Sequence, residues 1–222
     1  MRTLRRKLMM RMMFVLPSIY EKLEYIADTN GGWILTNLYL TSKSTLNMKV
    51  QPLIKKVVSF CGSTELFNKK DGYITKNAIG LGVSQNGTSF RFFWGSGSIQ
   101  NVFNVNNAIE GCLDCGTLNM KLDRIYNLSI ANNIASIDGE KVITLKNVEF
   151  KTKYPFSIFN LSRSVPSTGS IPPKRIYDLE IGGDLNAHFI PVKRKSDGVI
   201  GMYDLVGRKF YTSPNGVAFT GG

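Results

Sequence analysis

Short runs of alternating apolar and polar residues make up most of the chain after residue 17. The runs are separated by glycine, asparagine, aspartate and serine, which favour turns. Alternation with a period of two is typical of strands with one buried face. We therefore predict strands at residues 33–35, 46–50, 56–61, 78–83, 89–94, 126–130, 132–137, 141–145, 156–161, 176–181, 199–203 and 209–211.

Turn residues at three places indicate how these strands are joined. The pair Asn86-Gly87 between two strand-like runs predicts a hairpin, and Asp138-Gly139 predicts another. Residues 196–198 form a Ser-Asp-Gly turn before the last hairpin. Residues 162–173 are rich in serine, proline and glycine, but too little chain follows them for a separate core, so we keep this loop inside one domain.

The pattern predicts an all-β fold, an antiparallel sandwich of two sheets, because many short strands and no convincing helical run follow residue 20. With 222 residues, of which 43% are hydrophobic, the chain is long enough to bury a core. We divide it into a short N-terminal arm, residues 1–18, and one sandwich domain, residues 19–222.

The arm differs from the rest in charge and in periodicity. Of the net charge of +12, five positive charges and no acid fall in the first twenty residues. Apolar residues recur at helical spacing over residues 3–15, which predicts a short amphipathic helix that ends before Pro17. The residues expected to dock this arm in an assembly are Arg2, Leu4, Arg5, Arg6, Lys7, Leu8, Arg11 and Met12.

Three states of the arm are open: a disordered tail, a helix on a membrane surface, or a helix docked on a partner protein. Docking is favoured because leucine and methionine between the arginines suit an apolar groove. Nucleic acid is a less suitable partner, since the arm lacks the interleaved aromatic rings on which bases stack. No apolar run approaches the roughly 20 residues of a membrane span, and no signal-peptide cleavage site follows Leu16.

The chain contains few residues that could bind a metal or catalyse a reaction. Its three cysteines, Cys61, Cys112 and Cys115, do not form a disulfide framework, and they lack the partners for a structural zinc site. The segments around Asp71 and around Asp184 offer too few oxygens for calcium. We expect neither a metal nor a cofactor.

Catalytic chemistry has equally little support. Any nucleophilic site would need the single histidine, His188, which lies in an apolar run and is interpreted as a structural strand residue. Asp178 and Glu180 share one strand face, but this spacing is ordinary on the solvent side of a strand. A glycosidase that uses Glu110 or Asp178 remains an alternative, although we predict that the protein is not an enzyme.

The closing block, residues 193–205 with 209–212 and 219–221, resembles the C-terminus of laminin-G/concanavalin-like jelly-roll modules in phage and prophage structural proteins of gut bacteria. Residues 175–178, 188–191, 136–139 and 19–26 extend the resemblance. It implies a jelly roll and a place in a virion, made in the bacterial cytoplasm. The chain departs from the usual pattern at residues 28–34 and at Val192.

This resemblance implies a non-enzymatic virion structural protein, such as a capsid-decorating, head-fibre or tail-associated subunit, anchored by its arm. Its expected partners are capsid or tail proteins of the same particle, and we expect an oligomer. The alternative is a glycan-binding adhesin that contacts host-surface or mucus polysaccharide. Its candidate contacts are Tyr73, Arg91 and Trp94, because a sugar needs an aromatic ring and nearby polar groups.

Overall fold

A computed structural model describes residues 15–56, 58–69, 72–84, 87–102, 108–115, 120–122, 124–162 and 174–222. These residues form strands, turns and loops, and none of them is helical. The prediction of an all-β chain is therefore confirmed. In the described ranges, no helix exists that has the length and apolar character to cross a membrane.

The larger of the two sheets has eleven strands. Its main path runs in the order β11 (Glu140–Thr144), β10 (Ile134–Ile137), β9 (Tyr126–Ala131), β4 (Thr45–Pro52), β13 (Lys174–Gly182), β14 (Ala187–Arg194), β15 (Ile200–Asp204) and β16 (Lys209–Tyr211). Three short strands join this path at its side: β1 (Tyr20–Lys22) pairs with β14, β2 (Ile26–Asp28) pairs with β13, and β17 (Thr220–Gly221) pairs with β2. Both ends of the described chain thus belong to one sheet.

The smaller sheet has six strands, and it covers the other side of the core. Its order is β3 (Ile34–Leu35), β12 (Ser157–Ile158), β5 (Val58–Lys69), β6 (Gly72–Val83), β7 (Phe90–Val102) and β8 (Gly111–Cys115). The named strands pair antiparallel, except that β8 runs parallel to β7. The two-sheet sandwich that the strand pattern predicted is confirmed.

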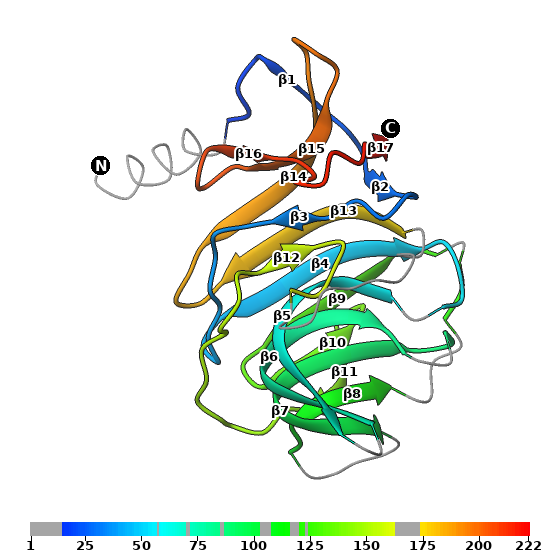
Figure 1. Ribbon diagram of the computed structural model, residues 1–222, viewed down its shortest axis with the longest axis vertical. Helices are drawn as coiled ribbons and strands as arrows, with labels where there is room; N and C mark the ends of the chain where they lie inside the picture. The colour runs from blue at the N-terminus through cyan, green and yellow to red at the C-terminus, as the bar shows by residue number, and fades with distance from the viewer. Residues whose placement is uncertain are drawn as a thin grey trace.

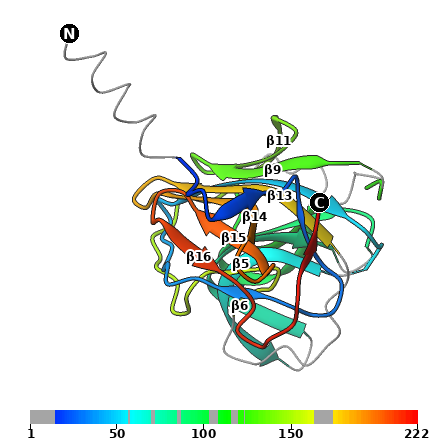
Figure 2. The same ribbon diagram turned by 90° about the horizontal axis from the view of Figure 1, so that it is seen from above.

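The two sheets lie in layers (Figures 1 and 2). Apolar side chains from both sheets fill the space between them. The larger sheet supplies Leu46, Met48 and Val50 of β4 and Leu128 and Ile130 of β9, and the smaller sheet supplies Phe60, Leu81, Phe90 and Phe92. Burial of each such side chain contributes about 1.5–3 kcal/mol to the free energy of unfolding. Alternate residues of β4 are buried, as its sequence pattern predicted.

The predicted hairpins are present, with small changes at their ends. Strands β6 and β7 pair antiparallel across the turn that contains Gly87, where φ is +69°. Strands β10 and β11 meet at Asp138-Gly139, both with positive φ. Strand β10 begins only at Ile134, because Asn132 and Asn133 adopt left-handed conformations and form the turn from β9. Residues 132–133 are therefore a turn, where we predicted a strand.

The chain after residue 173 belongs to the same sandwich as the chain before it. Strand β13 pairs with β4 over most of its length and with β2 at its start. Strands β14, β15 and β16 then extend the larger sheet. Most of the loop that we placed inside one domain, residues 163–173, lies outside the described part.

A β-bulge in β13 changes which side chains face solvent. The register with β4 shifts between Ile176 and Asp178, so Tyr177 and Asp178 both point away from the core while Ile176 and Leu179 point into it. The next outward residue is Glu180. Strict alternation from Leu179 would have directed Ile176 outward together with Asp178 and Glu180, so the bulge is what turns Ile176 into the core.

Candidate functional site

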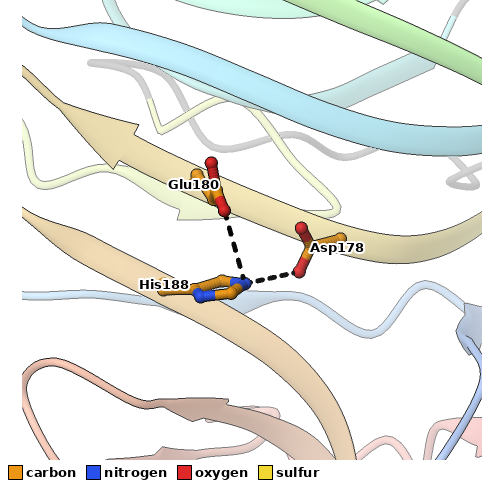
Figure 3. A group of neighbouring side chains, drawn as sticks. All are labelled: Asp178, Glu180 and His188. Carbon is orange, nitrogen blue, oxygen red and sulfur yellow. Dashed lines mark hydrogen bonds and ion pairs between the residues drawn. The ribbon is translucent and has the colours of Figure 1, made fainter. Parts of the chain in front are cut away.

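One cluster of ionisable side chains lies on the outer face of the larger sheet (Figure 3). Asp178 and Glu180 project from β13, and His188 projects from β14 between them. Glu180 and His188 are direct partners in the antiparallel register. The three side chains belong to adjacent strands of one rigid sheet, so their relative positions are set by backbone pairing.

The turn between β13 and β14 fixes that register. Gly183 has φ +89°, and a Cβ atom at this position would lie 2.0 Å from the carbonyl oxygen of Lys43, so only glycine fits. The adjacent Asp184 accepts hydrogen bonds from the hydroxyls of Thr41 at 2.5 Å and Ser44 at 2.8 Å. The turn is thereby tied to the loop before β4, and residues 180 and 188 are held opposite one another.

The backbone of His188 is also hydrogen-bonded on the side of β14 that faces β15. Its backbone N–H donates to Oδ1 of Asp204 at 3.0 Å, and its carbonyl oxygen accepts from the N–H of Leu205 at 2.8 Å. Asp204 is itself buried. The imidazole therefore extends from a backbone that is hydrogen-bonded on both sides.

The distances within the cluster are short and unequal. Nε2 of His188 lies 2.8 Å from Oδ1 of Asp178 and 3.8 Å from Oε1 of Glu180. One donor atom from each residue can be chosen so that all three lie within 4.8 Å of one another. Imidazole nitrogen and carboxylate oxygen are ligands that transition-metal ions accept, so this cluster is where the described chain could hold a metal.

The neighbouring charges favour the protonated imidazole. The hydrogen bond that Asp178 accepts from His188 raises the pKa of His188, partial burial opposes this, and the negative charges of Asp178, Glu180 and Asp204 raise it further. The sequence-based interpretation of His188 as a paired strand residue agrees with this geometry. Its partners were not foreseen.

Two surface hollows meet at His188. One, of about 420 Å³, lies over the β13–β14 turn and is bordered by Asn47, Glu180 and His188. The other, of about 540 Å³, extends toward β1 and is bordered by Lys49, Tyr177, Asp178 and His188. The cluster is therefore open to solvent and to a small ligand from two directions.

An aromatic and polar group continues the second hollow. The Tyr177 hydroxyl donates to Oε1 of Gln51 at 3.0 Å, and the Tyr177 ring packs against Tyr25 with centroids 5.8 Å apart. Arg175 lies over the Tyr25 ring and donates to the same Gln51 oxygen at 3.2 Å. This face thus combines partly exposed aromatic rings with hydrogen-bonding groups, which are the components of a sugar site.

The residues that the sequence suggested for glycan binding do not form such a surface. Trp94 is 1% exposed, its Nε1–H donates to the Lys146 carbonyl at 2.8 Å, and its ring packs edge-on against Phe150. Arg91 is 6% exposed and makes a two-point ion pair with buried Asp114. Neither side chain can reach a sugar, so their assignment to a glycan site is corrected. Tyr73 belongs to β6, but its side chain lies outside the described part.

The predicted docking residues of the arm cannot be placed in the same way. All of them, from Arg2 to Met12, lie outside the described residues. The description begins at Val15, which is 70% exposed.

The three cysteines are buried and do not lie together in one cluster. Cys112 packs with Ala78, Phe93 and Leu161, whereas Cys115 faces the main core on the opposite side of β8. Burial raises the pKa of both thiols to about 12 and raises that of Cys61 further. Their role is packing, as the sequence favoured.

The Asp178–Glu180–His188 cluster was missed because His188 was considered apart from the Asp178–Glu180 pair. Glycine and aspartate at residues 182–184 are a hairpin signal, and a hairpin centred on Asp184 places residue 180 opposite residue 188. That step would have paired Glu180 with the only histidine. Asp178 then joins the pair, because it shares the face of Glu180 by alternation along β13.

Comparisons with known proteins do not extend this description. Family models, curated proteins and solved structures all returned no match to the chain.

Proposed function

We propose that this protein is a non-enzymatic structural subunit of a phage particle, anchored by its N-terminal arm and displaying the sandwich domain outward. The motif resemblance of the closing block motivates the class of protein. The observation that supports anchoring by the arm is the position of residues 15–22. They join the sandwich at one end of the larger sheet, beside β16 (Figure 1).

Packing of the segment after the arm supports an anchoring role. The Tyr20 ring contacts Tyr203 and Phe210, with centroid separations of 4.9 and 5.4 Å. Strand β1 pairs with β14, and the Lys195 side chain donates to the Ser18 carbonyl at 2.7 Å. A pull on the arm would therefore be transmitted directly to the larger sheet.

Exposed apolar side chains at the base of the arm support docking on a protein. Val15 and Ile19 are 70% and 59% exposed, and they are the two most exposed of the four large hydrophobic residues identified as exposed in the described chain. An apolar partner groove that receives the arm could also cover these two residues. This arrangement favours a protein partner over nucleic acid, which would select only the positive charges.

The test is incorporation into the particle. A chain that begins at residue 15 should fold, because every strand of the described chain begins at Tyr20 or later, but it should be missing from purified particles that contain the full chain. Far-UV circular dichroism and the unfolding temperature provide the folding control. Normal incorporation of the shortened chain would contradict the proposal.

Glycan binding is the second candidate, and the open face around Tyr177 is the observation that favours it. A sugar in the 540 Å³ hollow would lie beside Tyr177, Lys49 and Asp178. On an array of host-surface and mucus polysaccharides, binding should be lost on Tyr177→Ala and kept on Trp94→Phe. Absence of binding across such an array would count against this candidate.

A further inference from the structure

We propose that Asp178, Glu180 and His188 bind a first-row transition-metal dication, for which Zn²⁺ is the probe. This site is independent of the arm and of the display role, so its failure would leave the proposed function unchanged. The geometry in Figure 3 carries the proposal.

The donor atoms suit such an ion in kind and in spacing. One imidazole nitrogen and two carboxylate oxygens form a mixed set that zinc accepts readily. Metal–ligand distances of about 2.1 Å in a tetrahedral site place ligand atoms about 3.4 Å apart. The observed separations from His188 Nε2, 2.8 Å to Asp178 and 3.8 Å to Glu180, lie on either side of that value. Small side-chain rotations that move the ligand atoms by a few tenths of an ångström would bring both separations close to 3.4 Å.

The backbone already holds the three residues in place. The β13–β14 register sets Glu180 opposite His188, and alternation along β13 places Asp178 on the same face as Glu180. The His188 N–H donates to Asp204 Oδ1, and the His188 carbonyl accepts from the Leu205 N–H, so the His188 backbone is also held on the β15 side. Little conformational entropy is lost when the ion binds, since only side-chain torsions need to adjust.

The charge of the cluster favours a dication. Among the described residues, the ion pairs of Asp178 and Glu180 are both made with His188. One imidazolium carries a single positive charge and cannot neutralise two carboxylates. A dication bound to the neutral imidazole would do so. Lys22 and Lys49 border the adjoining hollow, but Lys49 lies over the Tyr177 ring.

Space for the remaining ligands is present. The side chains are partly exposed, and the two hollows of about 420 and 540 Å³ meet at His188. Water could complete the coordination from either side. A site with three protein ligands and an open position also allows a second molecule to bind the metal.

The single histidine makes the experiment specific. His188 is the only imidazole in the 222-residue chain, so its ring signals in a ¹H–¹⁵N NMR spectrum report on this site alone. Titration of the full chain with ZnCl₂ in a non-chelating buffer should shift or exchange-broaden these signals saturably. Isothermal titration should give the same dissociation constant. MgCl₂ and CaCl₂ at the same concentrations should leave the imidazole signals unchanged.

Variants separate the proposed ligands from neighbouring charges. Glu180→Gln and Asp178→Asn should each weaken zinc binding about tenfold or more, and His188→Gln should abolish the calorimetric signal of this site. Glu24→Gln is the matched control, because Glu24 borders the 540 Å³ hollow but is not in the cluster. It should leave the affinity unchanged.

Two results would overturn the proposal. One is the wild-type protein showing no change in its imidazole signals at millimolar Zn²⁺. The other is an affinity that Glu180→Gln and Asp178→Asn leave intact, or that Glu24→Gln lowers equally. The wild-type spectrum decides the first point without any variant, so misfolding of a variant cannot conceal a failure.

Discussion

Nε2 of His188 lies 2.8 Å from Oδ1 of Asp178, across two neighbouring strands of the larger sheet. This contact depends on two backbone features. The hairpin turn at Gly183 sets the register of the strands, and alternation along β13 directs Asp178 to the same face as Glu180. Together they place the only histidine of the chain beside two carboxylates.

The first prediction concerns the titration of His188 in metal-free protein. Hydrogen bonding to Asp178 raises the pKa of His188 above 6.5, and the charges of Asp178, Glu180 and Asp204 act in the same direction. An NMR pH titration should give a value above 6.5 for the wild type, and Asp178→Asn should lower it. A pKa that Asp178→Asn does not change would show that the contact is absent in solution.

The same pair should contribute to stability in a defined pH range. Because the pKa of His188 is higher in the folded chain, the contribution is fully present below pH 6.5 and is lost as the pH rises through the folded value. Urea unfolding at pH 5.5 and pH 8.5 should therefore show a smaller stability difference between the wild type and His188→Gln at the higher pH.

The second prediction concerns a buried ion pair between β2 and β13. Lys174 and Asp28 are both 0% exposed, and Nζ of Lys174 lies 3.8 Å from Oδ2 of Asp28. Burial lowers the pKa of Lys174 to about 7, although the Asp28 charge opposes the shift, and burial raises the pKa of Asp28. The unfolded chain then binds more protons than the folded chain between about pH 7 and pH 10.5, so stability rises with pH in this window.

Urea unfolding at pH 7.5 and pH 9.5 measures this effect. The stability of the wild type relative to Lys174→Met should be greater at pH 9.5 than at pH 7.5, because the three buried thiols titrate alike in both chains and cancel in this difference. Lys193→Met is the control for the loss of a lysine at the surface, because Lys193 is exposed. It should change the pH dependence of stability much less than Lys174→Met. A wild-type stability that falls between these pH values to the same extent as in Lys174→Met would contradict the assignment.

Substitution of one partner should cost more than substitution of both. Lys174→Met leaves the Asp28 carboxylate buried without its cation, and we expect a loss of about 3–5 kcal/mol at pH 6, where Lys174 is protonated. Asp28→Asn/Lys174→Met should recover most of this loss, because asparagine can still accept the hydrogen bond that Gly32 donates to Oδ1 at 2.7 Å. A double variant as unstable as Lys174→Met would show that the loss is one of packing.

The third prediction separates stability from ligand binding in the smaller sheet. Trp94→Ala would create a cavity in the core and should cost about 3–5 kcal/mol. Arg91→Met should cost a similar amount, since it leaves Asp114 buried without its partner. Folded fractions of both variants should bind zinc like the wild type. A stability change below about 1 kcal/mol for Trp94→Ala would contradict its burial.

The cysteines provide the fourth prediction. Buried thiols with pKa values raised to about 12 or higher should not react with iodoacetamide at pH 8 in the folded protein. All three should react in urea. Mass spectrometry of the labelled chain measures both states, and rapid labelling of Cys112 or Cys115 in the folded state would show that β8 is open.

The sequence pattern was sufficient for the sandwich but not for the faces of its strands. Turn pairs such as Asp138-Gly139 and the alternation in β4 are local signals, and both agree with the structure. Trp94 was ambiguous, because β7 is buried on both faces: Phe93 packs in a second small cluster on the outer side. Period-two alternation cannot reveal which face a second layer covers.

The candidate site could not be predicted from single residues, because it depends on how two strands are paired. Asp178 and His188 are ten residues apart, and each alone has an ordinary structural interpretation. Their contact depends on the register of the β13–β14 hairpin, which neither residue indicates by itself. For the arm, only the sequence is available. Its composition predicts docking on a protein, and its docking residues lie outside the described chain.

Transfer of the arm tests the central claim most directly. Residues 1–18 would be fused to an unrelated monomeric soluble protein, and the number of fusion proteins per purified phage particle would be measured against the same carrier without the arm. The account predicts that the fusion is incorporated and that the full-length chain competes with it. A fusion that stays entirely unbound while the full-length chain is incorporated would contradict anchoring by the arm.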